Sequence, residues 1–404
     1  MKRPDRLRYS FLFLFIIVAT WTGAGLAVTA NRYKATAKAI TKVPETPAVH
    51  IRGGFIQYWG LLDKKTWTDV LDSMYQAGMR VIVLQYLQNH APGTDANGNA
   101  GLIDYNFFPP NPNDFDPTKL ILEYADAKKD MQVYIGLRQH AEFASRWNEA
   151  TFLNDPKDGE ARKNIDLANE LWRRYGKGKN GKPYKSFAGW YLPNEMWNQN
   201  YSDIEIVQLR QFFRTISEHC KKISNGKLIA VSPFFNPIDV PTPYLSAKDF
   251  AERYGEFLES EDKTQRAGVD LVMLQDGVGA RELNEQNLEG MIKPYFAEFR
   301  SMCNQKKVNL WANVESYEVR SGIRVPTNIS RLKAQIKVFN DAPQLADQLI
   351  TFDFFHYMNP CGHVHSEPEY QRAENELYWS YIQTYMSNPT KLKKPCPPRG
   401  TNLR

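Results

Sequence analysis

The sequence predicts an α/β fold, specifically a closed (β/α)₈ barrel, and three observations carry that prediction. Eight apolar runs occur between residues 51 and 388, and each is short enough to be a buried strand. Segments with helical spacing of apolar residues follow these runs. There is no Gly-rich loop after the first run, as an open dinucleotide-binding sheet would have. Eight strand–helix repeats are typical of barrel closure.

The chain before the barrel is expected to be an export segment followed by a linker. Four basic residues precede an uncharged run, Phe11–Ala30, so residues 1–30 are predicted to be a signal peptide or a membrane anchor. Residues 31–50 are polar, contain two prolines and are predicted to be a linker. The body would then be periplasmic, anchored to the inner membrane or secreted, because the basic end stays in the cytoplasm.

The first half of the barrel domain, residues 51–388, is predicted from alternating apolar runs and amphipathic segments. Trp67, Val70, Leu71 and Met74 recur at helical spacing and illustrate the pattern. The region Asn89–Asn113 is rich in Gly, Asn and Pro and is predicted to be a loop. The expected strands are 53–59, 80–87, 131–137 and 187–192, and the expected helices are 64–78, 117–129, 159–175 and 202–223.

The second half repeats the same pattern with longer connections. A Pro-rich loop follows the fifth strand, and the tail 389–404 is basic and Pro-rich. The expected strands are 227–235, 269–275, 309–314 and 348–355, and the expected helices are 247–260, 284–304, 328–340 and 369–386.

Polar and aromatic side chains gather at the predicted strand ends, where barrel enzymes place their active sites. Two of these strands end in a glutamate, Glu195 after the fourth and Glu315 after the seventh. Two carboxylates facing one site are what glycosidic bond cleavage requires. The rule selects Gln57, Trp59, Gln85, Tyr86, Arg138, His140, Asn194, Glu195, Gln275, Asp276, Glu315, Tyr317, His356 and Tyr357.

Three segments, Gly54–Trp59, Trp190–Glu195 and Phe352–Tyr357, carry a family resemblance. The sequence resembles a bacterial family of unknown function, domain-of-unknown-function family 4434, whose members are glycoside-hydrolase-like TIM barrels. The pattern of an Asn-Glu pair on strand four and a Glu on strand seven is similar to that of the clan A retaining glycosidases. That resemblance implies that Glu195 is the acid/base, Asn194 contacts the sugar 2-hydroxyl and Glu315 is the nucleophile.

One position departs from the clan A pattern. Members commonly carry an Arg near the end of strand two, whereas this strand ends in Gln85, Tyr86 and Leu87. Arg138 on strand three is the candidate replacement. The departure puts the geometry of substrate binding in question.

The two glutamates need different environments. A general acid must be protonated near neutral pH, and Trp190, Tyr191 and Trp197 could supply the apolar setting that raises the pKa of Glu195. The nucleophile must stay ionised, and Arg138, Gln275 or Tyr317 could hold Glu315 in that state.

Other strand-end residues have two open interpretations. Asp276 either binds a sugar hydroxyl or caps the following turn. The rings of Trp59, Trp197 and Tyr357 are candidate sugar platforms or plain packing residues. His140 and Glu142 are interpreted as subsite residues.

The composition argues against several other classes of function. The net charge of +6 comes without a dense basic cluster, so no nucleic-acid partner is expected. No cofactor motif occurs, and His363 and His365 beside Cys361 lack a second cluster at zinc-binding spacing, so no metal is expected. The other cysteine predictions are a disulfide between Cys361 and Cys396 and buried thiols at Cys220 and Cys303.

The leading hypothesis is therefore a glycoside hydrolase, a retaining β-glycosidase that acts on a polysaccharide or oligosaccharide outside the cytoplasm. The alternative is a non-catalytic carbohydrate-binding barrel in an exopolysaccharide assembly or export system. A weaker alternative is a metal-dependent deacetylase using His140 or His363.

Overall fold

The computed structural model describes most of the predicted barrel domain. The described residues are 50–57, 62–94, 100–109, 114–128, 130–178, 181–236, 244–259, 268–281, 283, 285–361 and 367–386. The predicted export segment 1–30, nearly all of the linker and the tail 389–404 lie outside them, so these assignments stay predictions. None of the helices in the described part of the chain combines the length and apolar character needed to cross a membrane.

Eight parallel strands close into a barrel, which confirms the predicted fold class. The strand order around the barrel is β1-β13-β10-β9-β8-β7-β5-β2, so each strand pairs with its successor in the predicted series of eight. The strands are β1 (Gly53–Ile56), β2 (Val81–Leu84), β5 (Gln132–Gly136), β7 (Phe187–Leu192), β8 (Leu228–Val231), β9 (Leu271–Gln275), β10 (Asn309–Glu315) and β13 (Gln348–Phe352).

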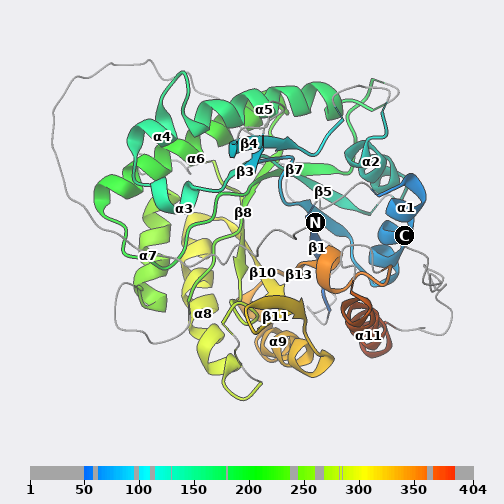
Figure 1. Ribbon diagram of the computed structural model, residues 1–404. Helices are drawn as coiled ribbons and strands as arrows, with labels where there is room; N and C mark the ends of the chain where they lie inside the picture. Colours follow the sequence, from blue (N-terminus) through cyan, green and yellow to red (C-terminus); the bar gives the residue numbers. More distant parts are fainter. Residues whose placement is uncertain are drawn as a thin grey trace. The chain divides into compact units, whose positions relative to one another are not determined.

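Helices surround the strands on the outside of the barrel (Figure 1). The long ones are α1 (Lys64–Gln76), α2 (Pro117–Lys128), α5 (Glu160–Tyr175), α6 (Asp203–Ile223), α7 (Ala247–Phe257), α8 (Leu288–Lys306), α9 (Ile329–Asp341) and α11 (Pro368–Tyr385). Shorter turns are α3 (Phe143–Arg146), α4 (Ala150–Asn154), α10 (Phe354–Tyr357) and the 3₁₀ turn η1 (Pro343–Leu345).

The strands are buried on both faces because their side chains alternate between two apolar clusters. On β2, Val81 and Val83 belong to the cluster inside the barrel, whereas Ile82 and Leu84 belong to the cluster between strands and helices. This double burial explains why the strands read as continuous apolar runs rather than alternating ones. It also gives the loops at the strand ends a rigid base.

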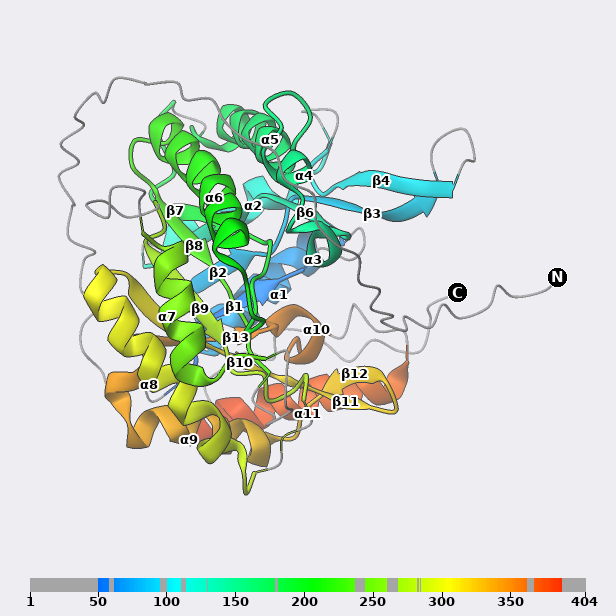
Figure 2. The same ribbon diagram turned by 90° about the vertical axis from the view of Figure 1, so that its left-hand side faces the viewer.

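Two β-hairpins extend the barrel at the carboxyl ends of its strands, and both fall in regions without a strong strand pattern. The first, β3 (Gln88–Thr94) with β4 (Ala100–Asn106), projects away from the barrel and pairs with β6 (Arg138–His140) (Figure 2). The predicted loop Asn89–Asn113 is therefore wrong. Its strands lie at the surface and are held by hydrogen bonds between strand backbones, so they do not need alternating apolar residues. The second hairpin joins β11 (Tyr317–Arg320) to β12 (Ile323–Pro326).

The predicted eighth strand is shorter than expected. It ends at Phe352, and Asp353 caps the helical turn α10 by accepting a hydrogen bond from the His356 backbone N–H at 2.6 Å. His356 and Tyr357 are therefore carried on a helical turn rather than on a strand end.

Candidate active site

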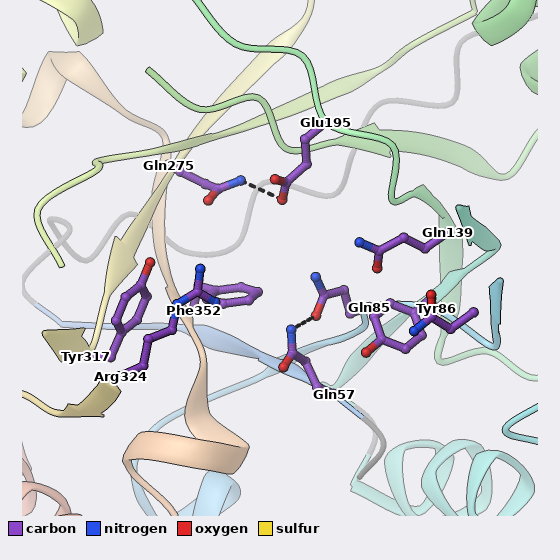
Figure 3. Close-up of a pocket in the computed structure, with 10 residues that line it drawn as sticks. Gln57, Gln85, Tyr86, Gln139, Glu195, Gln275, Tyr317, Arg324 and Phe352 are labelled. Carbon is purple, nitrogen blue, oxygen red and sulfur yellow. Dashed lines mark hydrogen bonds between the residues drawn. The ribbon is translucent and has the colours of Figure 1, made fainter. Parts of the chain in front are cut away.

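A polar cavity of about 330 Å³ opens at the carboxyl ends of the barrel strands. Four of the predicted site residues line it, and so do the strand-end residues Gln85 and Tyr86. Figure 3 shows glutamate, carboxamide and aromatic side chains converging on this space from different strands. Its lining consists of Gln57, Gln85, Tyr86, Asn89, Gln139, Glu195, Gln275, Tyr317, Arg324 and Phe352.

Glu195 lies in the cavity wall, in the loop that leaves β7. Gln275, the last residue of β9, donates a hydrogen bond from Nε2 to Glu195 Oε1 at 2.9 Å (Figure 3). Burial, and to a lesser degree the charge of Glu315, raise the pKa of Glu195 to about 7 against the opposing effects of Gln275 and Arg324. A carboxyl group with this pKa is protonated for much of the time near neutral pH, as a general acid must be.

Glu315 ends β10 and is only 2% exposed. Its Oε2 accepts a hydrogen bond from the backbone N–H of Ala280 at 2.7 Å. A β-carbon at residue 279 would collide with the Tyr317 carbonyl oxygen, so glycine allows the backbone at Gly279 to lie this close to Tyr317. Burial raises the pKa of Glu315, and the Ala280 amide, Arg324 and the Tyr317 hydroxyl oppose that rise.

Asp276 is buried beneath Glu315 and does not reach the cavity. It is 0% exposed and accepts hydrogen bonds from Gln335 Nε2 at 2.6 Å and from the backbone N–H groups of Val278 and Glu315 at 3.2 Å each. Of the two interpretations of Asp276, its bond to Val278 favours turn capping, and contact with a sugar hydroxyl stays a prediction.

Asp276 also competes with Glu315 for a proton. Burial, and then the charge of Glu315, raise the pKa of Asp276 to about 7. Two neighbouring buried carboxyl groups do not both ionise readily. The Ala280 backbone amide and Arg324 favour the ionised form of Glu315 over that of Asp276.

Arg324 is the site residue that the sequence analysis missed. It lies on β12, and its guanidinium carbon is 5.0 Å from the centre of the Tyr317 ring, beside which Figure 3 shows it. Its positive charge lowers the pKa of both Glu195 and Glu315. The only sequence signal was the turn at Ser321 and Gly322, which take positive φ angles of 52° and 78° and close the hairpin.

Arg138 does not take the place of the strand-two Arg. It is 1% exposed, and its Nε donates to Glu160 Oε2 at 3.0 Å while Nη1 pairs with Asp104. His140, 5% exposed, packs edge-on against Phe152 and tilts against His90 at 4.5 Å between ring centres. Burial lowers the pKa of His140 to about 4. Both side chains lie against Glu160 on α5 and neither lines the cavity, so their contact with substrate stays a prediction.

Asn194 is buried directly before Glu195. Its Nδ2 lies 3.5 Å from the Arg138 carbonyl oxygen, and its Oδ1 has no hydrogen-bond partner among the described residues. A buried carboxamide oxygen of this kind normally finds a donor. A contact between Asn194 and a sugar hydroxyl stays a prediction.

Two of the three predicted aromatic platforms, Trp197 and Tyr357, do not line the cavity. Trp197 stacks on Phe234 with the ring centres 5.7 Å apart, and Tyr357 packs against Tyr317 at 5.1 Å. These contacts favour the packing interpretation for both rings. Trp59 lies outside the described residues, and its role stays a prediction.

His356 supports the site from below rather than lining it. Its Nδ1 is 2.7 Å from Asp353 Oδ2, and the residue is 7% exposed. The predicted substrate contact of His356 is therefore not made in this structure.

Nothing in the described part of the chain groups three or more His, Cys, Asp or Glu side chains suitably for a metal ion. His363, His365 and Cys396 lie outside that part, so the disulfide between Cys361 and Cys396 stays a prediction. Cys220 and Cys303 are buried free thiols, as predicted.

Comparison with known proteins places the chain in a family. The family described as "Domain of unknown function (DUF4434)" matches residues 51–364, and the chain belongs to it. No curated protein sequence matches the chain.

Two solved structures show the same barrel fold. One is a provisionally named alpha-L-fucosidase from Bacteroides thetaiotaomicron VPI-5482, with 20% identity, 84% of this chain and 98% of the other covered, and a TM-score of 0.59. The other is the endo-1,4-beta-D-mannanase from Thermotoga petrophila RKU-1, with 13% identity, 83% and 100% covered, and a TM-score of 0.56.

Proposed function

We propose that this member of the DUF4434 family is a retaining β-glycosidase that cleaves a polysaccharide or oligosaccharide. The observation that carries the proposal is the pair Glu195 and Glu315: Glu195 lines the cavity, the charge of buried Glu315 raises the pKa of Glu195, and the two glutamates have different surroundings. The raised pKa of Glu195 favours its protonated form, whereas the Ala280 amide and Arg324 favour the ionised form of Glu315. This is the division of roles that glycosidic bond cleavage needs.

The two residues would act in sequence. Glu195 donates its proton to the glycosidic oxygen while Glu315 attacks the anomeric carbon, so the leaving sugar departs and a glycosyl ester forms on Glu315. Glu195, now a carboxylate, removes a proton from water, which attacks the anomeric carbon and releases Glu315. Arg324 and the Ala280 amide stabilise the Glu315 carboxylate before attack and after release.

Two further observations support the proposal. The mannanase from Thermotoga petrophila is named for cleaving β-1,4-linked mannan on the same fold. The basic and apolar residues 1–30 favour action outside the cytoplasm, after export or from a membrane anchor.

The test is to replace each glutamate and measure release of reducing sugar from a panel of glycans. We expect Glu195→Gln to lower kcat about 10²- to 10⁴-fold, and Glu315→Gln to lower it about 10⁴-fold or more. Glu218→Gln, at an exposed position on α6 outside the cavity, is the matched control and should leave kcat unchanged.

Unchanged turnover in both active-site variants would remove the hydrolase proposal. Glycan binding without any release of reducing ends by the parent protein would instead support the carbohydrate-binding barrel.

A further inference from the structure

We infer that the carboxamides of Asn89 and Gln139, together with the Gln57–Gln85 pair, form a subsite that binds an uncharged sugar ring through its hydroxyl groups. The inference rests on the proposed function only in taking the cavity as the glycan site. It concerns the wall formed by β1, β2, β3 and β6, away from Gln275 and Glu195 (Figure 3).

The register of the β3–β6 pair brings the first two carboxamides together. Asn89 lies opposite Gln139 in this parallel pair, and both line the cavity. Their neighbours on each strand point the other way, since Gln88 accepts a hydrogen bond from Arg138 at 2.7 Å. Because strand side chains alternate, the ion-paired face and the carboxamide face of this sheet are separate.

Gln139 carries an unsatisfied group that points to a ligand. Its Oε1 is buried and has no hydrogen-bond partner among the described residues. Figure 3 shows the Gln139 carboxamide directed into the cavity, toward the hydrogen-bonded carboxamides of Gln57 and Gln85. A buried acceptor without a donor is unfavourable, and a sugar hydroxyl would supply the missing donor.

The chemistry of this wall favours a neutral ring over a charged one. A carboxamide both donates and accepts hydrogen bonds, as a sugar hydroxyl does, and carries no charge. Carboxylate and sulfate groups are instead bound by Arg or Lys. Arg324 is the one cationic side chain in the described cavity lining, and it already faces Glu195 and Glu315 across from the carboxamide wall.

Binding can be measured without turnover in the Glu315→Gln variant of the full chain. The probes are tetrasaccharides of mannose, glucose and xylose, with a galacturonic acid tetrasaccharide as the charged counterpart, titrated by calorimetry. We expect at least one neutral probe to bind about 10-fold or more tightly than the charged probe. Adding Gln139→Met or Asn89→Ala should weaken that binding about 3- to 10-fold each.

Asn106→Ala is the matched control, because Asn106 lies on the same small sheet but bonds to Gln88 on its other face. It should leave the affinity unchanged, and thermal unfolding should show that every variant is folded. Equal or tighter binding of the charged probe, binding of no probe, or unchanged affinity in both carboxamide variants would overturn the inference.

The two proposals fail separately. Neutral-sugar binding that depends on Gln139 in a protein that never releases reducing ends would keep this inference and remove the hydrolase. Hydrolysis that is indifferent to Gln139 and Asn89 would do the reverse.

Discussion

Glu160 and Glu315 are both buried carboxylates, yet their surroundings differ in kind. Glu160, 0% exposed, begins α5 and is held by Arg138 Nε and Lys163 Nζ, each at 3.0 Å. Glu315, 2% exposed, has a backbone amide at 2.7 Å and a competing carboxyl group, Asp276, bonded to its own N–H. The first carboxylate is neutralised by cations in contact with it, and the second is not.

The difference distinguishes a structural charge from the one that the proposed reaction uses. A fully paired buried ion is stable and has no remaining capacity for a substrate. A carboxylate whose pKa is raised by burial keeps basicity and nucleophilicity that a reaction could use. Three experiments break or sharpen this comparison.

The largest expected effect is on stability at the paired site. Glu160→Gln removes the charge and leaves Arg138 buried with only partial compensation, so we expect the free energy of unfolding to fall by about 3–5 kcal/mol. Glu315→Gln removes a buried charge that has no cation in contact with it among the described residues, so it should leave the free energy of unfolding unchanged or raise it. Urea unfolding measures both, and equal loss in the two variants would contradict the distinction.

A smaller effect is expected from the pH dependence of stability at Asp276. Its pKa is raised to about 7 in the folded state, so its contribution to stability is fully present below the unfolded pKa near 4 and is lost as the pH rises through 7. Between pH 5.5 and 8 the parent should lose about 2 kcal/mol more than Asp276→Asn.

Parallel urea titrations at the two pH values check this, with Glu195 present in both proteins. The same pH dependence in parent and variant would show that Asp276 does not hold the proton.

The smallest effect is on the pH profile of activity through Arg324. Its charge lowers the pKa of Glu195 and Glu315, so Arg324→Met should raise both and move the profile of kcat/KM to higher pH by about 1 unit. Arg324→Lys retains the charge and should retain the profile. Identical profiles for the two variants would show that the charge of Arg324 does not control the glutamates.

The barrel and its two glutamates were predictable because they depend on local patterns. Each strand is a short apolar run, and the end of such a run in a barrel lies at the mouth whatever surrounds it. Glu195 and Glu315 end two such runs, and Gln57, Gln275 and Tyr317 follow from the same rule. The sequence by itself therefore determined the fold class and the location of the site.

Only the tertiary structure decided whether each strand-end side chain points into the cavity or away from it, and which other side chains it contacts. Gln275 and Asp276 are adjacent, but one lines the cavity and the other lies beneath it, because strand side chains alternate and the register selects the face. Arg138 pairs with Glu160 on α5 and does not line the cavity, whereas Arg324 lines it from the β11–β12 hairpin. Such pairings depend on segments that are distant in the chain, and no local pattern of apolar residues records them.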